Sequence, residues 1–343
     1  MKKFALLLII LMLPALIFAG PRSDTPTLTV YTNSGSDGRD AWLIDRAAQD
    51  GFKIQILEAG AANIQNRLIA EQNAPIADVV FGLTPFIWED LINRNMFVHY
   101  VPSWAAQIPA GMNDPRGNFH GIVVQAILLV YDLNQLNAAD APRDWTDLWR
   151  DSRFHGRYVY DATFGGATPR MVLSGIISRY LDPNGELGVS AEGWREIEAY
   201  IQRGRISESG MDLYARIANR DEPILMGQMW SSGVADRDVQ YGTRTGYVVP
   251  SVGVPFLVEG VAIINGTRHL AEAQRFVDWF GTPEVQGDWA ERFATIPAHP
   301  GAAHRISQMA RDMAALPPQV IDWSVVGRHI DAWVERIILQ YMD

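Results

Sequence analysis

The chain has 343 residues with a formal net charge of −10, and 48% of its residues are hydrophobic. An acidic chain without a basic run is a poor candidate for binding nucleic acid or an anionic membrane surface. The sequence contains no cysteine, which excludes thiol nucleophiles, thiolate metal sites and redox-active cysteine pairs.

The N-terminal residues have the pattern of a secretory signal peptide. Two lysines precede an apolar run that ends at Phe18 and is followed by Ala19, so we predict that residues 1–19 are removed by cleavage after Ala19. The run is shorter than the roughly 20 residues needed to cross a bilayer. We therefore expect a soluble protein in the periplasm or outside the cell, with two domains that each have their own core.

The chain then alternates between apolar strand patterns and amphipathic helix patterns. We predict strands at residues 28–31, 52–57 and 77–82, with helices between them at 42–48 and 62–72. This alternation indicates an α/β fold with a parallel sheet covered on both faces. Ligands of such sheets bind beyond the carboxyl ends of the strands. The residues that this rule places along one wall of a binding site are Thr32, Asn33, Ser34, Gly35, Ser36, Leu83 and Thr84.

The loop after the first strand is rich in small polar residues and leads directly into a helix. Its backbone N–H groups and the positive end of the helix dipole suit an anion or a hydroxyl-rich ligand. A capped turn without any ligand is an equally good interpretation, because Ser and Asn are ordinary N-cap residues.

Two later apolar stretches predict strands that cross between two lobes. The first, residues 121–131, has Gln125 as its only polar side chain. A buried Gln needs hydrogen-bond partners, which a ligand or, more commonly, the backbone supplies. The second stretch, residues 247–264, holds Glu259 inside an apolar run. Because burying an unpaired carboxylate is costly, we predict that Glu259 lies at the floor of a cleft between the lobes. The alternative is that Glu259 forms a structural ion pair with an arginine.

A second wall is predicted from loops that follow strands at 158–160 and 223–226. Two glycines in the first loop let the backbone approach a ligand, and we predict Thr168 as the N-cap of a helix over 170–180, with Pro169 at its first position. In the second loop a tryptophan beside two hydroxyls suits a ring stacked on a sugar-like face, with a core position as the alternative. The candidates on this wall are Thr163, Gly165, Gly166, Ala167, Thr168, Arg170, Trp230, Ser231 and Ser232.

The remaining segments are predicted to be mainly helical. Helices are expected within residues 185–220, at 270–280 and through 306–342, and Thr282 is a predicted N-cap. Residues 182–186 are similar to a calcium-binding turn, but the glycine is misplaced for one, so we predict a loop.

Several segments match those of a known family in order and spacing, over nearly the whole chain after the signal peptide. They are ADVVFG at 77–82, PRDWTDL at 142–148 with His155 and Gly156 after it, PFLVEGVA at 255–262, and the helical segment 271–286. The chain resembles the extracellular solute-binding proteins of ABC importers with the type II periplasmic-binding fold, in the branch of ferric-ion, thiamine and sugar-phosphate binders.

The resemblance implies two α/β lobes, each a mostly parallel sheet covered by helices, joined by two crossing strands. Lobe 1 would comprise residues 27–120 and 256–343, and lobe 2 residues 121–255. The lobes would close over one small molecule, without catalysis, cofactor or metal, and deliver it to a membrane permease and its ATPase. We expect a monomer that does not bind nucleic acid.

The resemblance leaves the ligand open. Ferric-ion binders of this family use two consecutive tyrosines, where this chain has Trp230, Ser231 and Ser232, and hydroxyls beside a tryptophan replace phenolates poorly. We favour a small anionic or polyhydroxylated organic solute, such as a phosphorylated sugar or a phosphonate, bound by loop N–H groups, Arg170 and Glu259. A cationic thiamine- or polyamine-like solute held by Glu259 and Trp230 is an alternative, as is a ferric ion. A secreted hydrolase using Glu259 or an Asp as general acid is a further alternative, although the chain lacks Gly-x-Ser-x-Gly and His-Glu-x-x-His motifs.

Overall fold

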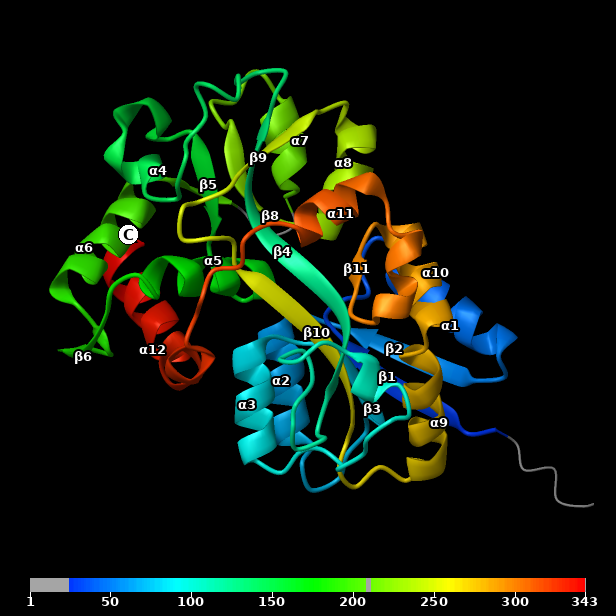
Figure 1. Cartoon of the computed structure of the whole chain (residues 1–343). Coiled ribbons are helices and arrows are strands. Elements are labelled where there is room, and N and C mark those ends of the chain that lie inside the picture. The colour runs from blue at the N-terminus through cyan, green and yellow to red at the C-terminus, as the bar shows by residue number, and fades with distance from the viewer. Residues whose placement is uncertain (1–24, 208–210, 343) are drawn as a thin grey trace, which may run out of the picture.

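The computed structural model describes residues 25–207 and 211–342. The predicted signal peptide, residues 1–19, lies outside the described residues. No helix in the described part of the chain is long and apolar enough to cross a membrane. The described residues form two lobes of sheet and helices, and strands run from one lobe into the other (Figure 1).

The first lobe is built on a parallel sheet, as the alternation of strand and helix patterns predicted. Its strands are β1 (Thr27–Thr32), β2 (Lys53–Glu58) and β3 (Val79–Gly82), with β1 in the middle and parallel to both neighbours. Helices cover both faces, because the strands are apolar on both. One face carries α1 (Arg39–Gln49), α9 (Leu270–Phe280) and α10 (Pro283–Phe293), and the other α2 (Ala61–Ala70) and α3 (Pro85–Asn93).

Two long antiparallel strands connect the lobes. The strand β4 (His120–Asp132) pairs with β10 (Phe256–Ile263) through residues 120–126 and with β8 (Met226–Trp230) through residues 127–131. Because β10 also pairs with β3, one hydrogen-bonded sheet extends from the first lobe into the second. Every residue of β4 is buried, as its unbroken apolar pattern predicted.

The second lobe continues the sheet with shorter strands and its own helices. The strand β5 (Tyr158–Asp161) lies parallel to β8 and to β7 (Arg205–Ser207), and β9 (Thr245–Val248) pairs with residues 129–132 of β4. The two-residue strand β11 (Ile296–Pro297) pairs instead with residues 123 and 124 of β4, in the half that also pairs with β10. The other α-helices of the described chain are α4 (Asp147–Arg150), α5 (Ala167–Ile177), α6 (Ala191–Arg203), α7 (Leu213–Ala218), α8 (Val234–Tyr241), α11 (Gln308–Ala314) and α12 (Trp323–Tyr341). Short 3-10 helices occupy Ala105–Gln107, Ser152–Phe154, Ser231–Gly233 and Pro300–Arg305.

The buried apolar side chains form two large clusters that follow the two faces of the sheet. One contains Ile64 of α2 together with Ile197 of α6, and the other contains Leu43 of α1 together with Tyr214 of α7. Each cluster therefore includes residues of both lobes, which corrects the prediction of a separate core for each domain. The reason is that β4 runs through both lobes and presents successive side chains to opposite faces of the sheet.

The C-terminal helix α12 packs against both lobes. It contacts α3 in the first lobe and α5 and α6 in the second. Trp333 is fully buried, and its indole N–H donates to the carbonyl of Leu187 at 2.9 Å. Trp323 lies against Phe86 with ring centroids 6.5 Å apart. The assignment of residues 256–343 to the first lobe stays a prediction.

Four local predictions were wrong. The tail predicted to be helical through 306–342 is interrupted between Ala314 and Trp323, where Pro317 and Pro318 cannot continue a helix. The strand expected at 223–226 begins only at Met226 and extends through Trp230, because its ladder with β4 includes these residues. Residues 182–186, predicted as a loop, belong to the short strand β6 (Leu181–Glu186). Helix α5 begins at Ala167 with Gly166 as N-cap, so Thr168 lies inside the first turn, where Pro169 is tolerated since the first N–H groups lack helical partners.

We expect Trp333→Ala to lower the free energy of unfolding by about 3–5 kcal/mol, because it leaves a cavity beneath α12. Urea denaturation measures this change. The control is Leu339→Ala on the same helix, where the side chain is 71% exposed and the loss should stay below about 0.5 kcal/mol. Equal losses in the two variants would show that α12 is not docked as described.

Candidate functional site

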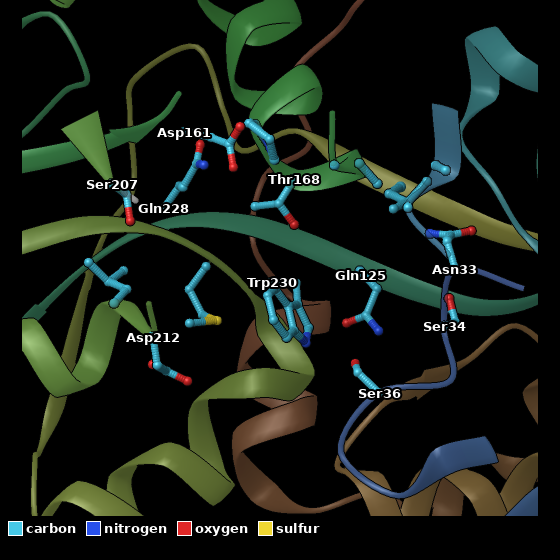
Figure 2. Close-up of a pocket in the computed structure, with 18 of the residues that line it drawn as sticks. Asn33, Ser34, Ser36, Gln125, Asp161, Thr168, Ser207, Asp212, Gln228 and Trp230 are labelled. Carbon is cyan, nitrogen blue, oxygen red and sulfur yellow. The ribbon is translucent and has the colours of Figure 1, made fainter. Parts of the chain in front are cut away.

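A cavity of about 470 Å³ lies where the loops of the two lobes face one another, above the crossing strands. Figure 2 shows its polar lining around Trp230, with Asn33, Ser34 and Ser36 on one side and Asp161, Ser207 and Gln228 on the other. Cavities of roughly 300–1,000 Å³ are typical of sites for small organic molecules. The position and size of the cavity make it the candidate site.

Half of the predicted binding residues line this cavity. They are Asn33, Ser34, Ser36, Gln125, Gly166, Ala167, Thr168, Trp230 and Glu259. The remaining predicted residues do not line it: Thr32, Gly35, Leu83, Thr84, Thr163, Gly165, Arg170, Ser231 and Ser232. Contact of any of them with a solute stays a prediction, but the structure shows what several of them do instead.

In the first wall, two predicted residues hold the loop in shape. The hydroxyl of Thr32 accepts a hydrogen bond from the N–H of Ser34 at 2.9 Å, and the side-chain oxygen of Asn33 accepts one from the N–H of Leu83 at 2.6 Å. Gly82 adopts a φ of 107°, and a side chain there would meet the Asn33 oxygen at 2.4 Å. Leu83 and Thr84 are fully buried. The strand end therefore positions Ser34 without itself facing the cavity.

In the second wall, Arg170 is a structural residue and not a pocket residue. Its guanidinium donates to the carbonyl of Phe164 at 2.8 Å and pairs with Asp331 of α12 at 2.7 Å. The hydroxyl of Thr163 donates to Asp161 at 2.9 Å and accepts from the N–H of Gly165 at 3.1 Å. These contacts fix the glycine loop and α12, so Arg170 contributes no charge to the cavity lining.

The two serines after Trp230 turn toward Gln125. The amide oxygen of Gln125 accepts from the Ser231 hydroxyl at 3.0 Å and from the Ser232 N–H at 3.2 Å, and its amide nitrogen donates to the Ser232 hydroxyl at 2.9 Å. The Ser231 hydroxyl also accepts from the N–H of Ala126 at 3.1 Å. The partners expected from a ligand or the backbone thus come mainly from these side chains, which fasten the end of β8 to β4.

Glu259 lines the cavity from β10, next to a β-bulge between Glu259 and Gly260. Its side chain is buried, and within the described residues it forms no salt bridge, so the alternative of a structural ion pair is not realised there. Burial raises the pKa of Glu259, while hydrogen bonds from Ser34 and Gln125 and the charge of Arg39 partly oppose the rise.

Two arginines in the lining were missed by the sequence analysis. Arg39 is the first residue of α1 and Arg237 lies on α8. The guanidinium of Arg237 covers the ring of Trp230 at 4.7 Å from its centroid, and Arg39 lies over Phe293 at 5.1 Å. Arg39 directly follows the polar loop and could have been included with it. Arg237 lies in a polar helical segment that carries no such signal.

Other missed residues stand at strand ends or within a strand. Asp161 and Ser207 are the last residues of β5 and β7, where the rule for parallel sheets could have placed them. Gln228 was assigned to a loop, although it lies in β8. Asp212 precedes α7, and its carboxylate accepts from the N–H of Tyr214 at 2.8 Å.

The lining combines two cationic side chains, several hydroxyl and amide groups, carboxylates and the partly buried ring of Trp230. This set can hold a small molecule that has an anionic group and several hydrogen-bonding groups. Among the described residues, no group of three or more His, Cys, Asp or Glu side chains is placed to hold a metal ion.

Two α/β lobes, strands that cross between them and a polar cavity at the crossing define the type II periplasmic-binding fold. Residues 74–316 match the family described as bacterial extracellular solute-binding protein, and the chain belongs to this family. Its role is that of the substrate-binding component of an ABC transporter.

Three known proteins illustrate the similarity. A probable ABC transporter periplasmic-binding protein, y4fP, from Sinorhizobium fredii is 35% identical over 315 residues, which cover 92% of this chain and 86% of that protein. The periplasmic binding protein AfuA from Actinobacillus pleuropneumoniae, solved with exogenous fructose-6-phosphate bound, has a TM-score of 0.76 at 19% identity, over 91% of this chain and 99% of that one. Iron-bound HitA from Pseudomonas aeruginosa has a TM-score of 0.74 at 20% identity, over 91% and 99%.

We expect Glu259→Gln to stabilise the solute-free protein at pH 8 and to have little effect at pH 4. Burial raises the pKa of Glu259 in the folded protein, so stability is lost as the pH rises from the unfolded-state pKa through the folded-state pKa. The gain at high pH is about 1.4 kcal/mol for each unit of upward shift. Urea denaturation at both pH values measures it.

The matched control is Glu192→Gln, at an exposed position on α6. Its free energy of unfolding should change by less than about 0.5 kcal/mol at either pH. An equal stabilisation by Glu259→Gln at pH 4 and pH 8 would contradict a carboxylate destabilised by burial.

Proposed function

We propose that this binding component captures a small anionic or polyhydroxylated organic solute, such as a phosphorylated sugar or a phosphonate, and hands it to a membrane permease with its ATPase. The single observation that carries the proposal is the convergence of Arg39 and Arg237 with the polar loops in one cavity. The likeness to a protein solved with fructose-6-phosphate supports the same class.

The proposed capture step uses both walls of the cleft. Ser34 and Ser36 come from the first lobe, and Thr168 and Trp230 come from the second. A solute that contacts both sets favours the closed arrangement of the lobes, because ligand binding shifts the population toward the state it binds better. The carboxylate of Glu259 would accept hydrogen bonds from solute hydroxyl groups at the floor.

A cationic solute is the main competing proposal, and the carboxylates of Glu259, Asp161 and Asp212 in the lining favour it. Against it, the face of Trp230 is already covered by the guanidinium of Arg237, and two like charges repel each other in so confined a site. Asp212 is also paired with Arg237 at 3.0 Å.

A ferric ion is a second competing proposal, supported by the likeness to iron-bound HitA. Hard cations of this kind prefer oxygen ligands. The described residues that line the cavity include one tyrosine, Tyr160, and the loop after β8 turns its serines toward Gln125. We also propose that the protein acts in the periplasm as a monomer and does not chemically alter its solute.

We expect phosphorylated sugars or phosphonates to raise the melting temperature by about 5 °C at concentrations near 100 times the dissociation constant. Unphosphorylated sugars, thiamine and polyamines serve as the comparison set in the same thermal-shift assay. Stabilisation by the amines with no response to the phosphorylated compounds would reverse the choice of solute class.

Trp230→Ala should abolish most of this ligand-induced shift, because it removes the aromatic wall of the cavity. The matched control is Trp323→Ala on α12, a partly buried tryptophan outside the lining. Both variants lower the melting temperature, but only Trp230→Ala should lose the shift. Mass spectrometry of the solute after incubation tests for turnover, and a changed mass would support an enzyme instead.

A further inference from the structure

The loop between β1 and α1 places a carboxylate between two arginines of different lobes. One oxygen of Asp37 accepts a hydrogen bond from Nη1 of Arg39 at 2.9 Å and lies 3.4 Å from Nη1 of Arg237. Arg39 belongs to the first lobe and Arg237 to α8 of the second. One guanidinium group from each lobe therefore contacts the carboxylate of Asp37, and Arg237 is paired with Asp212 as well.

The two arginines are held in place by contacts other than Asp37. Arg39 donates from Nη2 to the Ser232 hydroxyl at 3.1 Å, and Arg237 donates from Nε to Asp212 at 3.0 Å. The side chains of Arg39 and Arg237 are only 5% and 11% exposed. Each also stacks over an aromatic ring, so both guanidinium groups would stay in position if the shared carboxylate left.

Asp37 is the most exposed partner in this arrangement. Its side chain is 29% exposed, so moving it into water requires little rearrangement. Its backbone has a φ of 58°, followed by Gly38 at 79°, a left-handed conformation that Asp adopts more readily than most residues.

We propose that Arg39 and Arg237 form one anion subsite spanning both lobes, which Asp37 occupies until an anionic group of the solute displaces it. This inference rests on the proposed solute-binding function and narrows its ligand class. A phosphoryl group carries about −1.5 to −2 charges at neutral pH and three acceptor oxygens, whereas Asp37 offers one charge. A dianionic phosphoryl group therefore competes well for the two guanidinium groups, and a single carboxylate competes poorly.

The displacement would also couple ligand charge to lobe closure. An anion held by Arg39 and Arg237 contacts both lobes at once, and Ser232, which accepts from Arg39, is bonded in turn to Gln125 of the crossing strand β4. A solute that carries too little negative charge would not displace Asp37 from Arg39 and Arg237.

Calorimetric titration with inorganic phosphate at pH 8, at low ionic strength, tests the subsite directly. Asp37→Asn keeps a residue that tolerates the left-handed backbone and removes the competing charge, so phosphate should bind about tenfold more tightly, which is about 1.4 kcal/mol. Arg237→Gln should weaken phosphate binding at least about tenfold. Asp45→Asn, an exposed residue on α1 with the same change in net charge, should bind phosphate as the wild type does.

Unchanged or weaker phosphate binding by Asp37→Asn would overturn the proposal, as would unchanged binding by Arg237→Gln in a variant whose circular dichroism matches the wild type. Glucose 6-phosphate and glucose separate this inference from the general function. A solute that binds the wild type and Asp37→Asn equally tightly would refute the subsite and leave the solute-binding role standing. If phosphate binds and the variants change its affinity as expected, but no organic solute binds, the subsite would stand and the solute-binding role would be refuted.

Discussion

The exchange of partners along β4 is the interaction on which the structure depends. Its first half lies between β10 and β11 and its second half between β8 and β9, and the change of neighbours occurs around Ala126 and Ile127. At that point the N–H of Ala126 donates to the Ser231 hydroxyl instead of a neighbouring strand. Since a buried backbone N–H without a partner is costly, Ser231 makes the exchange possible, and the cavity lies directly above it.

The polar residues of the cleft form two layers with different tasks. The lower layer, Gln125 with Ser231 and Ser232, is hydrogen-bonded mainly within itself and fastens the end of β8 to β4, although Gln125 also borders the cavity. The upper layer faces the cavity and includes Ser34 and Arg237. Glu259 lies between the layers without a salt bridge among the described residues, which is why burial dominates its pKa.

Much of the fold could be predicted from the sequence, because it follows from local patterns. Apolar alternation located β1, β2 and β3, and the unbroken apolar run identified β4 as a buried crossing strand. The carboxylate of Glu259 was recognisable because it interrupts such a run. The first residue of β8 could not be predicted from the sequence, because it is set by pairing with β4, and strand pairing depends on tertiary structure.

The candidate site was predicted less well, for a physical reason. Residues at strand ends can be inferred from topology, and Asn33, Ser34 and Thr168 were found in this way. Whether a polar side chain faces a ligand or a neighbouring residue depends on partners distant in the chain. Arg170 was expected in the cavity but meets Asp331, while Arg237, in an unremarkable helix, reaches it.

The two apolar clusters that run along the sheet faces have a consequence for how such a protein can be divided. Neither half can be cut out as an autonomous fragment, because excision would expose the flank of β4 and strip α12 of one of its supports. A chimera in which one lobe is replaced by that of a related protein would also have to include the crossing strands and the C-terminal helix α12 from that protein. The two lobes therefore depend on each other for stability, because they share the same buried clusters.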